Sequence, residues 1–545
     1  MCMVFWHHPE VEEGRVPGGL AKVFSCLFNE RSPILIIGFW ALLYAFRPFT
    51  LGLYHDDWWS LVEAVHGSAP FSLTRLHEFV GSASAFAPRP VSGFITFLVN
   101  SIAGTSPFVY QACSSVLVLL AALSLRAWFR GLLYQTDAFT RSVASNLGTA
   151  FWLSAPWSVA GTAWPVAALG VLPAQIFFTE AARQILPPKR VTAANVVKLG
   201  LGLLASYLAY EAFYFHFLVV VLFYMIAVRN ILPTWSARAW VGGTALMAQL
   251  LALGLNRYMA AAAHGNSKTL NPHWPNLVLA NCTNLPHELL IRFGNSYRLW
   301  LAVAAVLLAV AVIALVVAIF LRQTRTTAAT AFGCFAAGMI ALPITALTYG
   351  LANYELSSTG VNSRTFVAIS WALALVCFAL VIMLGLIRLR FLRFAAMILP
   401  LWLIAMNARA QLSLVSDWAA VWKVEKEVLA QAPIAALKAL PPDSRVLYIG
   451  PSYYHDVVIF GAYWDLTAAV SATPALSAGR KAFQGCITNH PATSRYNWSW
   501  DGQTLTQECP GYWKVNFPAK HLFVWNYDEH RMFEAKDGFQ WTGAK

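Results

Sequence analysis

Residues 33–60 read PILIIGFWALLYAFRPFTLGLYHDDWWS, an apolar run that ends in two adjacent carboxylates and two tryptophans. The run from Pro33 to Leu53 has about the 20 residues that a helix needs to cross a bilayer. It has no short apolar core followed by a small-residue cleavage site, so we interpret it as a retained membrane anchor. The mostly polar residues 1–32 are expected to form a cytoplasmic N-terminal segment.

Similar apolar runs recur along the chain. Of 545 residues, 58% are hydrophobic and only 12% are charged, whereas about 25% are charged in soluble domains. Transmembrane helices are predicted near 33–53, 107–128, 142–161, 164–184, 196–211, 212–228, 239–257, 299–321, 328–351, 365–387 and 394–409. The predicted fold class is therefore an all-α polytopic membrane protein with about 11 transmembrane helices.

The basic residues between these runs predict the orientation. With a cytoplasmic N-terminus, every short inner loop is basic, as cytoplasmic loops usually are. These loops contain Arg126, Arg130 and Arg141; Arg183, Lys189 and Arg190; Arg229 and Arg238; Arg322 and Arg325; and Arg388, Arg390 and Arg393. The apolar stretch from Pro90 to Gly104 is too short to cross, so we expect a helix lying on the outer leaflet. The net charge of +13 is explained by this topology, and no nucleic-acid partner is predicted.

This topology divides the chain into a transmembrane domain over 33–410 and a periplasmic C-terminal domain over 411–545. The outer segments are a first loop at 54–106, a middle loop near 258–298 and the C-terminal domain. An amphipathic helix from Asp417 to Lys438 and a strand from Arg445 to Gly450 predict a small α/β unit. In that unit, Cys486 and Cys509 could pair in an oxidising compartment. The expected location is the bacterial inner membrane, crossed many times.

Asp56 and Asp57 are the first candidate functional residues. They follow directly after the first apolar run and precede two tryptophans suited to the membrane interface. One interpretation is a solvated helix exit with an aromatic belt. The other is a carboxylate held at the membrane surface, where it can take a proton from an acceptor hydroxyl. His55 stands beside the pair as a neighbour that could contact substrate.

Cations and one further acid extend the candidate set. Arg89, in Ala87-Pro-Arg-Pro-Val-Ser-Gly93, could bind a phosphate through two N–H donors, or extend its charge to the headgroups. Arg364 could be a second phosphate ligand. Glu211 lies near the outer end of a predicted helix, where an unpaired charge is costly. It could bind sugar hydroxyls or pair with a cation such as Arg47.

The first 130 residues resemble GT-C superfamily glycosyltransferases. An acidic pair at a helix exit, a loop of about 30 residues, a basic residue before proline and an interfacial helix make up this layout. The Arg-Pro-x-x-Gly spacing is similar to that of the lipid A aminoarabinose transferases, and Tyr-x-Asp-Asp-Trp is similar to that of bacterial O-antigen glucosyltransferases. Protein O-mannosyltransferases have the same plan with Asp-Glu. The remainder resembles the superfamily only in its helix count and its outer C-terminal domain.

The resemblance implies roles for two residues. It makes Asp56 the catalytic base and Arg89 the ligand of the donor phosphate, where the aminoarabinose enzymes use lysine. It implies a sugar donor carried on a polyprenyl phosphate and an envelope glycan or lipid as acceptor. We therefore expect direct displacement with inversion, with Asp57 orienting Asp56 or contacting the acceptor.

Missing motifs support a membrane-borne donor. The sequence has no phosphate-binding loop, no dinucleotide fingerprint and no predicted cytosolic domain large enough for a nucleotide sugar. No cofactor is predicted, and the spacing of histidines and cysteines indicates no metal site, although dependence on a divalent cation stays open. The alternative function is a transporter or lipid flippase, which usually has ionisable groups near mid-membrane and often two repeated halves.

Overall fold

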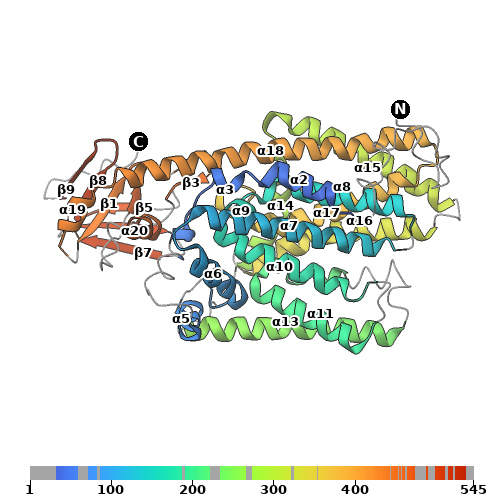
Figure 1. The fold of residues 1–545 in the computed structure, drawn as a ribbon, viewed down its shortest axis with the longest axis horizontal. Helices are drawn as coiled ribbons and strands as arrows, with labels where there is room; N and C mark the ends of the chain where they lie inside the picture. Colours follow the sequence, from blue (N-terminus) through green and yellow to red (C-terminus); the bar gives the residue numbers. More distant parts are fainter. Residues whose placement is uncertain are drawn as a thin grey trace.

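The structure is a computed structural model. It describes residues 32–58, 60, 72–82, 86–134, 136–186, 191–220, 234–264, 273–320, 325–352, 354–441, 444–451, 453–455, 457–460, 463–472, 486–488, 497–501, 503–509, 513–518 and 522–534. Most helices run along one long axis, and the strands gather at one end of it (Figure 1). The predicted N-terminal segment and part of the first outer loop lie outside the described residues.

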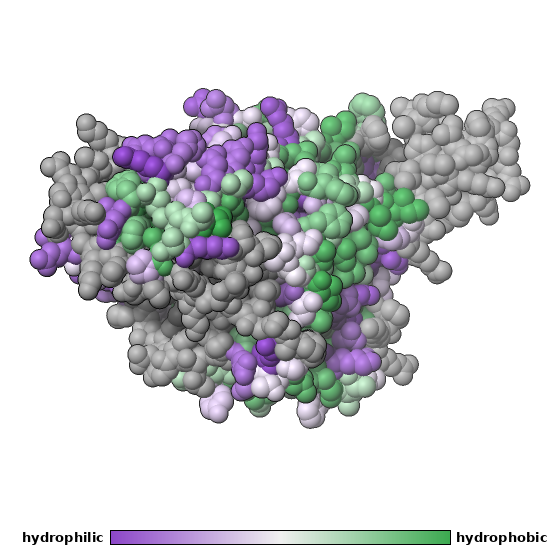
Figure 2. All heavy atoms as spheres, turned by 60° about the vertical axis from the view of Figure 1, so that its left-hand side comes forward, coloured by the Kyte–Doolittle hydropathy of each residue, from purple (hydrophilic) through white to green (hydrophobic). Residues whose placement is uncertain are grey.

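Seven helices of the described part are long and apolar enough to cross a membrane. They are α7 (Pro107–Leu132), α10 (Pro165–Arg183), α13 (Trp235–His264), α15 (Tyr297–Phe320), α16 (Arg325–Leu351), α17 (Val367–Gly385) and α18 (Arg390–Ala430). Large apolar side chains point outward from them, such as Ile313 at 64% exposure and Met247 at 58%. Figure 2 shows a band of hydrophobic surface on this part of the molecule. Such a surface is suited to lipid rather than water.

Shorter apolar helices complete the helical part. They include α2 (Ile34–Tyr44), α3 (Arg47–Thr50), α8 (Ala138–Leu153), α9 (Ala160–Ala163), α11 (Ala193–Ala209) and the segment Glu211–Val220. The helices α5 (Leu73–Ser82) and α6 (Pro90–Ala103) belong to the first outer loop. Helix α6 ends at Gly104, whose φ is 53°. Glycine adopts this left-handed conformation without strain. The predicted polytopic helical fold is confirmed, although the span near 212–228 is described only as far as Val220.

Several elements differ from the sequence-based boundaries. The predicted span at 142–161 is divided, because α8 ends at Leu153 and a 3-10 turn at Pro156–Ser158 precedes α9. The middle outer loop contains a helix that was not predicted, α14 (Trp274–Ile291), which packs against α16. The last part of the predicted amphipathic helix is the separate helix α19 (Ile434–Ala439). The predicted last span and the first part of that amphipathic helix form one continuous helix, α18, of 41 residues, which ends at Ala430. Pro400 lies inside it, but no glycine interrupts the helix, so the change from apolar to amphipathic sequence does not end it.

The C-terminal part is the small α/β unit that the sequence predicts. Its main sheet has the order β4-β1-β8-β9, in which β1 (Arg445–Ile449) pairs in parallel with β4 (Cys486–Thr488) and β8 (Leu522–Asn526). Strand β9 (Arg531–Glu534) pairs antiparallel with β8. The other elements are α19 (Ile434–Ala439), α20 (Tyr463–Ser471), the pair β2 (Tyr453–Tyr454) and β3 (Val457–Val458), and the sheet of β5 (Asn497–Trp500), β6 (Thr504–Cys509) and β7 (Trp513–Pro518). The side chains of Cys486 and Cys509 lie outside the described part, so their pairing stays a prediction.

One hydrophobic cluster joins the first outer loop, α18 and the C-terminal unit. Tyr54 is fully buried there, and its hydroxyl donates a hydrogen bond of 3.0 Å to the carbonyl of Trp418 on α18. A Cβ atom on Gly52 would lie 1.9 Å from the ring of Trp422, so only glycine permits this close approach. Leu466 of α20 belongs to the same cluster. The loop that follows the first apolar run is therefore held between the helical part and the C-terminal unit.

Candidate functional site

Asp57 is a buried anchor of the first outer loop, with an exposure of 3%. One carboxylate oxygen accepts the backbone N–H of Tyr54 at 2.8 Å, and the other accepts the N–H of Val166 at the start of α10 at 2.7 Å. Burial raises the pKa of Asp57 well above its ordinary value, although the two N–H donors act in the opposite direction. Both oxygens are thus engaged in holding the loop against α10.

Asp56, its neighbour, presents its carboxylate to the outside. Its side chain is 38% exposed, and its Oδ1 lies 3.7 Å from Nε2 of His55. Because the buried Asp57 holds the adjacent backbone, the position of Asp56 is well defined. An exposed carboxylate on a fixed backbone can take a proton from a hydroxyl that arrives from solvent.

His55 connects Asp56 to the C-terminal unit. Its backbone has a φ of 44°, in the left-handed region that few residues other than glycine adopt. Its Nδ1 contacts Oδ2 of Asp465 on α20, and its ring lies 5.5 Å from that of Trp164. Burial lowers the pKa of His55, but the carboxylates of Asp465 and Asp56 outweigh burial and raise this pKa to about 9. The imidazole is therefore a cation at neutral pH.

Arg89 and Glu211 form a largely buried ion pair. Arg89 immediately precedes α6, and its Nε donates a 2.7 Å hydrogen bond to Oε2 of Glu211, while Nη2 contacts Oε1. Burial lowers the pKa of Arg89, but Glu211 outweighs it, so this pKa is raised. The suggested pairing of Glu211 with Arg47 is wrong, because Glu211 binds Arg89. Arg47 is buried elsewhere and donates hydrogen bonds to Thr162 and to the Leu43 carbonyl.

Arg364 is a second arginine that lies against aromatic rings. It belongs to the 3-10 turn η6 (Gly360–Phe366) just before α17. Its guanidinium carbon lies 5.1 Å from the ring centre of Trp164 and 5.9 Å from that of Tyr354. It is close enough to interact electrostatically with Asp56 and Tyr210. Both arginines thus combine a charge with an aromatic face.

The structure brings every candidate from the sequence into one cluster. Tyr210 lies between the two arginines, since its ring centre is 4.5 Å from the guanidinium carbon of Arg89 and Arg364 interacts with it. Trp164 in turn contacts His55, and its indole N–H donates a 3.0 Å hydrogen bond to the carbonyl of Tyr54. The cluster therefore contains His55, Asp56, Asp57, Arg89, Glu211 and Arg364.

Sequence reasoning missed four residues of this cluster. Trp164, Tyr210 and Tyr354 are aromatic residues at the ends of apolar runs, and their positions resemble ordinary interface anchors. Asp465 lies 410 residues from its partner His55. No short motif could have related these two side chains.

In its neutral form, the imidazole of His55 could also hold a metal ion together with Asp56 and Asp465. One ligand atom from each lies within 4.8 Å of the other two. An imidazole nitrogen with two carboxylates is a donor set that suits zinc and manganese. Spacing along the chain could not indicate this set, because Asp465 comes from a distant element.

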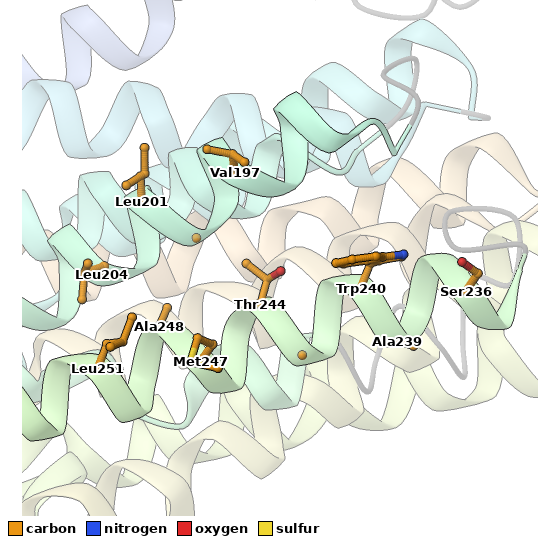
Figure 3. A pocket seen from close by; sticks show the side chains of 12 residues that line it. Val197, Leu201, Leu204, Ser236, Ala239, Trp240, Thr244, Met247, Ala248 and Leu251 are labelled. Atoms are coloured by element: carbon orange, nitrogen blue, oxygen red, sulfur yellow. The ribbon is translucent and has the colours of Figure 1, made fainter.

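An apolar groove of about 670 Å³ lies between α11 and α13, away from this cluster (Figure 3). Val197, Leu201 and Leu204 line it from α11, and Met247 and Leu251 line it from α13. Its polar lining residues are only Ser236 and Thr244. The groove contains none of the candidate residues, and its lining is suited to hydrocarbon.

Comparisons with protein-family models and with curated proteins give no match. Among solved structures, the chain is similar to the crystal structure of ArnT from Cupriavidus metallidurans in the apo state. The TM-score is 0.44 at 12% sequence identity, over 84% of this chain and 86% of that chain. This likeness concerns the fold alone. No residue role is transferred from it.

Proposed function

We propose that the chain is an inverting glycosyltransferase that moves a sugar from a polyprenyl-phosphate-linked donor to a cell-envelope acceptor. The acceptor would be O-antigen, lipid A or another surface glycan. The observation that supports this proposal is the meeting of an exposed carboxylate, Asp56, with the guanidinium groups of Arg89 and Arg364 around shared aromatic rings. A proton acceptor beside cations that can hold phosphate is what displacement of a sugar from a phosphate requires.

Asp56 is the base of the proposed reaction. The acceptor hydroxyl gives its proton to the Asp56 carboxylate as its oxygen forms a bond to the anomeric carbon. The bond between that carbon and the phosphate oxygen breaks, and polyprenyl phosphate leaves with the electron pair. A single displacement of this kind inverts the configuration at the anomeric carbon. Asp57 contributes by holding the backbone in place, since both its oxygens bind backbone N–H groups.

Arg89 and Arg364 stabilise the departing phosphate. The pair with Glu211 uses Nε and Nη2 of Arg89, so within the described part of the chain the N–H donors on Nη1 are available for a phosphate oxygen. Glu211 then orients Arg89, and it can also meet sugar hydroxyls. In a site from which water is excluded, holding charge that develops on the leaving group is usually the largest contribution to rate.

The proposed location is the bacterial inner membrane, with the N-terminus in the cytoplasm and the C-terminal unit in the periplasm. The basic residues of the short loops support this orientation. In Figure 1 the helices α5 and α6 and the C-terminal unit lie at the same end of the long helices. In the proposed orientation the site lies at the periplasmic membrane surface, within reach of a lipid-borne donor. The proposed transmembrane domain covers 33–410 and the periplasmic domain covers 411–545.

A transfer assay on membranes tests the proposal. Membranes that contain the wild type, Asp56→Asn or Asp417→Asn are supplied with a radiolabelled polyprenyl-phosphate hexose panel and an envelope extract. Asp417 is a matched control, because it is an aspartate of α18 whose partner, His455, lies outside the cluster. We expect label to reach the extract with the wild type and the control, and transfer to be lost in Asp56→Asn at unchanged protein level. Near-normal transfer by Asp56→Asn would contradict the assignment of the base.

A lipid flippase or transporter is the alternative proposal. It is favoured if the wild type and both variants leave the label on the lipid while the labelled lipid changes leaflet. The described cluster argues against it, because its charged residues lie just after α3, just before α6 and in η6 just before α17, rather than within the membrane-spanning helices.

A further inference from the structure

We propose that Asp465, which belongs to the C-terminal unit, is a positioning residue: through His55 it fixes the position of the catalytic carboxylate of Asp56. This inference rests on the proposed function. It makes the C-terminal unit an integral part of the active site, and not only an outer domain joined to it.

The geometry forms a chain of contacts from α20 to the base. Oδ2 of Asp465 contacts Nδ1 of His55, and Nε2 on the other side of the same ring faces Oδ1 of Asp56 at 3.7 Å. Asp465 is fully buried, whereas Asp56 is 38% exposed. The buried Asp465 therefore fixes the His55 ring, and the ring in turn limits where the exposed carboxylate of Asp56 can lie. A histidine that binds a carboxylate through one nitrogen has its other nitrogen directed by that bond.

The backbone at His55 supports a role beyond packing. A φ of 44° is strained for a residue with a side chain, and such strain persists where surrounding contacts hold it. The ring is held by Asp465 on one side and by Trp164, at 5.5 Å between ring centres, on another. Because Asp56 is the next residue, rotation at His55 would displace the catalytic carboxylate.

The hydrophobic cluster around this contact packs α20 against the first loop. Leu466, next to Asp465, is buried in the same cluster as Tyr54, next to His55. The charged groups that face His55 are Asp465 from α20, Asp56 from its own loop and Arg364 from η6. Asp465 is the one of these groups that contacts Nδ1, so removing its carboxylate removes the buried partner that orients the ring.

The first measurement does not depend on transfer. Diethyl pyrocarbonate modifies an imidazole nitrogen that no partner holds, so its rate of reaction with His55 at one fixed pH, followed by peptide mass spectrometry, reports whether Asp465 holds this ring. In the wild type we expect slow reaction of His55. In Asp465→Asn the rate should rise, and in Asp417→Asn it should equal that of the wild type. The control removes a different His–Asp contact between α18 and the C-terminal unit, that of Asp417 with His455.

The second measurement is transfer by the same purified proteins. We expect kcat of Asp465→Asn to fall by about 10²-fold, with an altered pH profile and little change in KM for the lipid donor, because the base is misplaced while the phosphate ligands are intact. His55→Asn, in which asparagine tolerates the left-handed backbone, should show the same loss. It also serves as the test variant if Asp465→Asn does not fold.

The outcomes are separable. Wild-type transfer with equal rates and pH profiles in Asp465→Asn and His55→Asn would overturn the inference and leave the proposed function intact. No transfer by the wild type would refute the function, while an unchanged rate of His55 modification in Asp465→Asn would refute the contact. If a chelator makes His55 of the wild type react faster, a metal ion occupies the cluster, and the direct contact with Asp465 is refuted.

Discussion

Replacing Arg89 and Glu211 by glutamine, singly and together, separates two roles of the arginine. In one role Arg89 only neutralises Glu211, a largely buried carboxylate with 13% of its side chain exposed. In the other role it also binds the donor phosphate. A double-mutant cycle that measures both stability and transfer distinguishes these roles, because the double variant removes both charges at once.

The magnitudes follow from the burial of the pair. Removing one partner of a buried ion pair costs about 3–5 kcal/mol, because the other charge is left uncompensated. Arg89 is 21% exposed, so we expect the lower end, about 3 kcal/mol, for each single variant. The double variant removes both charges of this pair and should return to within about 1 kcal/mol of the wild type.

Transfer should follow a different pattern. Loss of a group that stabilises developing charge costs about 10²–10³ in kcat. We therefore expect that loss in Arg89→Gln and, undiminished, in the double variant, whereas Glu211→Gln keeps its arginine and loses less. The restored stability of the double variant excludes misfolding as the cause.

Thermal unfolding in detergent, followed by tryptophan fluorescence, and the lipid-donor transfer assay supply the two readouts. The Asp417→Asn variant serves as the control in both. A double variant that transfers at the wild-type rate would refute phosphate binding by Arg89. Single variants as stable as the wild type would refute the energetic reasoning about the buried pair.

Further predictions concern the neighbouring residues. Asp57→Ala should be destabilised by about 1–3 kcal/mol for each of the N–H groups of Tyr54 and Val166 that loses its acceptor, and an unchanged unfolding midpoint would contradict this role. Arg364→Gln should lower kcat by about 10²-fold, measured with saturating donor, and a change in KM alone would assign it to ground-state binding. The pKa of His55 is raised from 6.5 to about 9, so its contribution to stability is complete below about pH 6.5 and is lost as the pH rises through 9. Unfolding midpoints between pH 6 and 10 should show this loss in the wild type and not in His55→Asn.

The sequence alone indicated the helical membrane fold. It also indicated which helix ends carry candidate functional residues. A bilayer requires long apolar runs with internal hydrogen bonding, and this requirement is visible in any stretch such as 299–321. Asp56 and Arg89 were also identified as candidate residues, because a charged side chain next to an apolar run is energetically unfavourable unless a partner or a ligand stabilises it. The small α/β unit followed from the change of composition and from the strand at Arg445, confirmed as β1.

Element boundaries were less predictable, because they depend on packing. Helix α14 forms in a segment that was expected to be a loop, where it packs against α16. Helix α18 continues through the expected domain boundary near residue 410, because local sequence contains no strong signal to stop it. Neither feature follows from hydropathy alone.

The partners of the charged residues were decided by the tertiary structure. The sequence left two kinds of partner open for Glu211, sugar hydroxyls or a cation such as Arg47, and only the folded chain selects Arg89, 122 residues away. Likewise, the sequence showed His55 beside Asp56 but not Asp465, which is brought to it from α20. The physical reason is that apolar periodicity and charge cost are local properties of the chain, whereas the pairing of charges depends on which distant elements pack together.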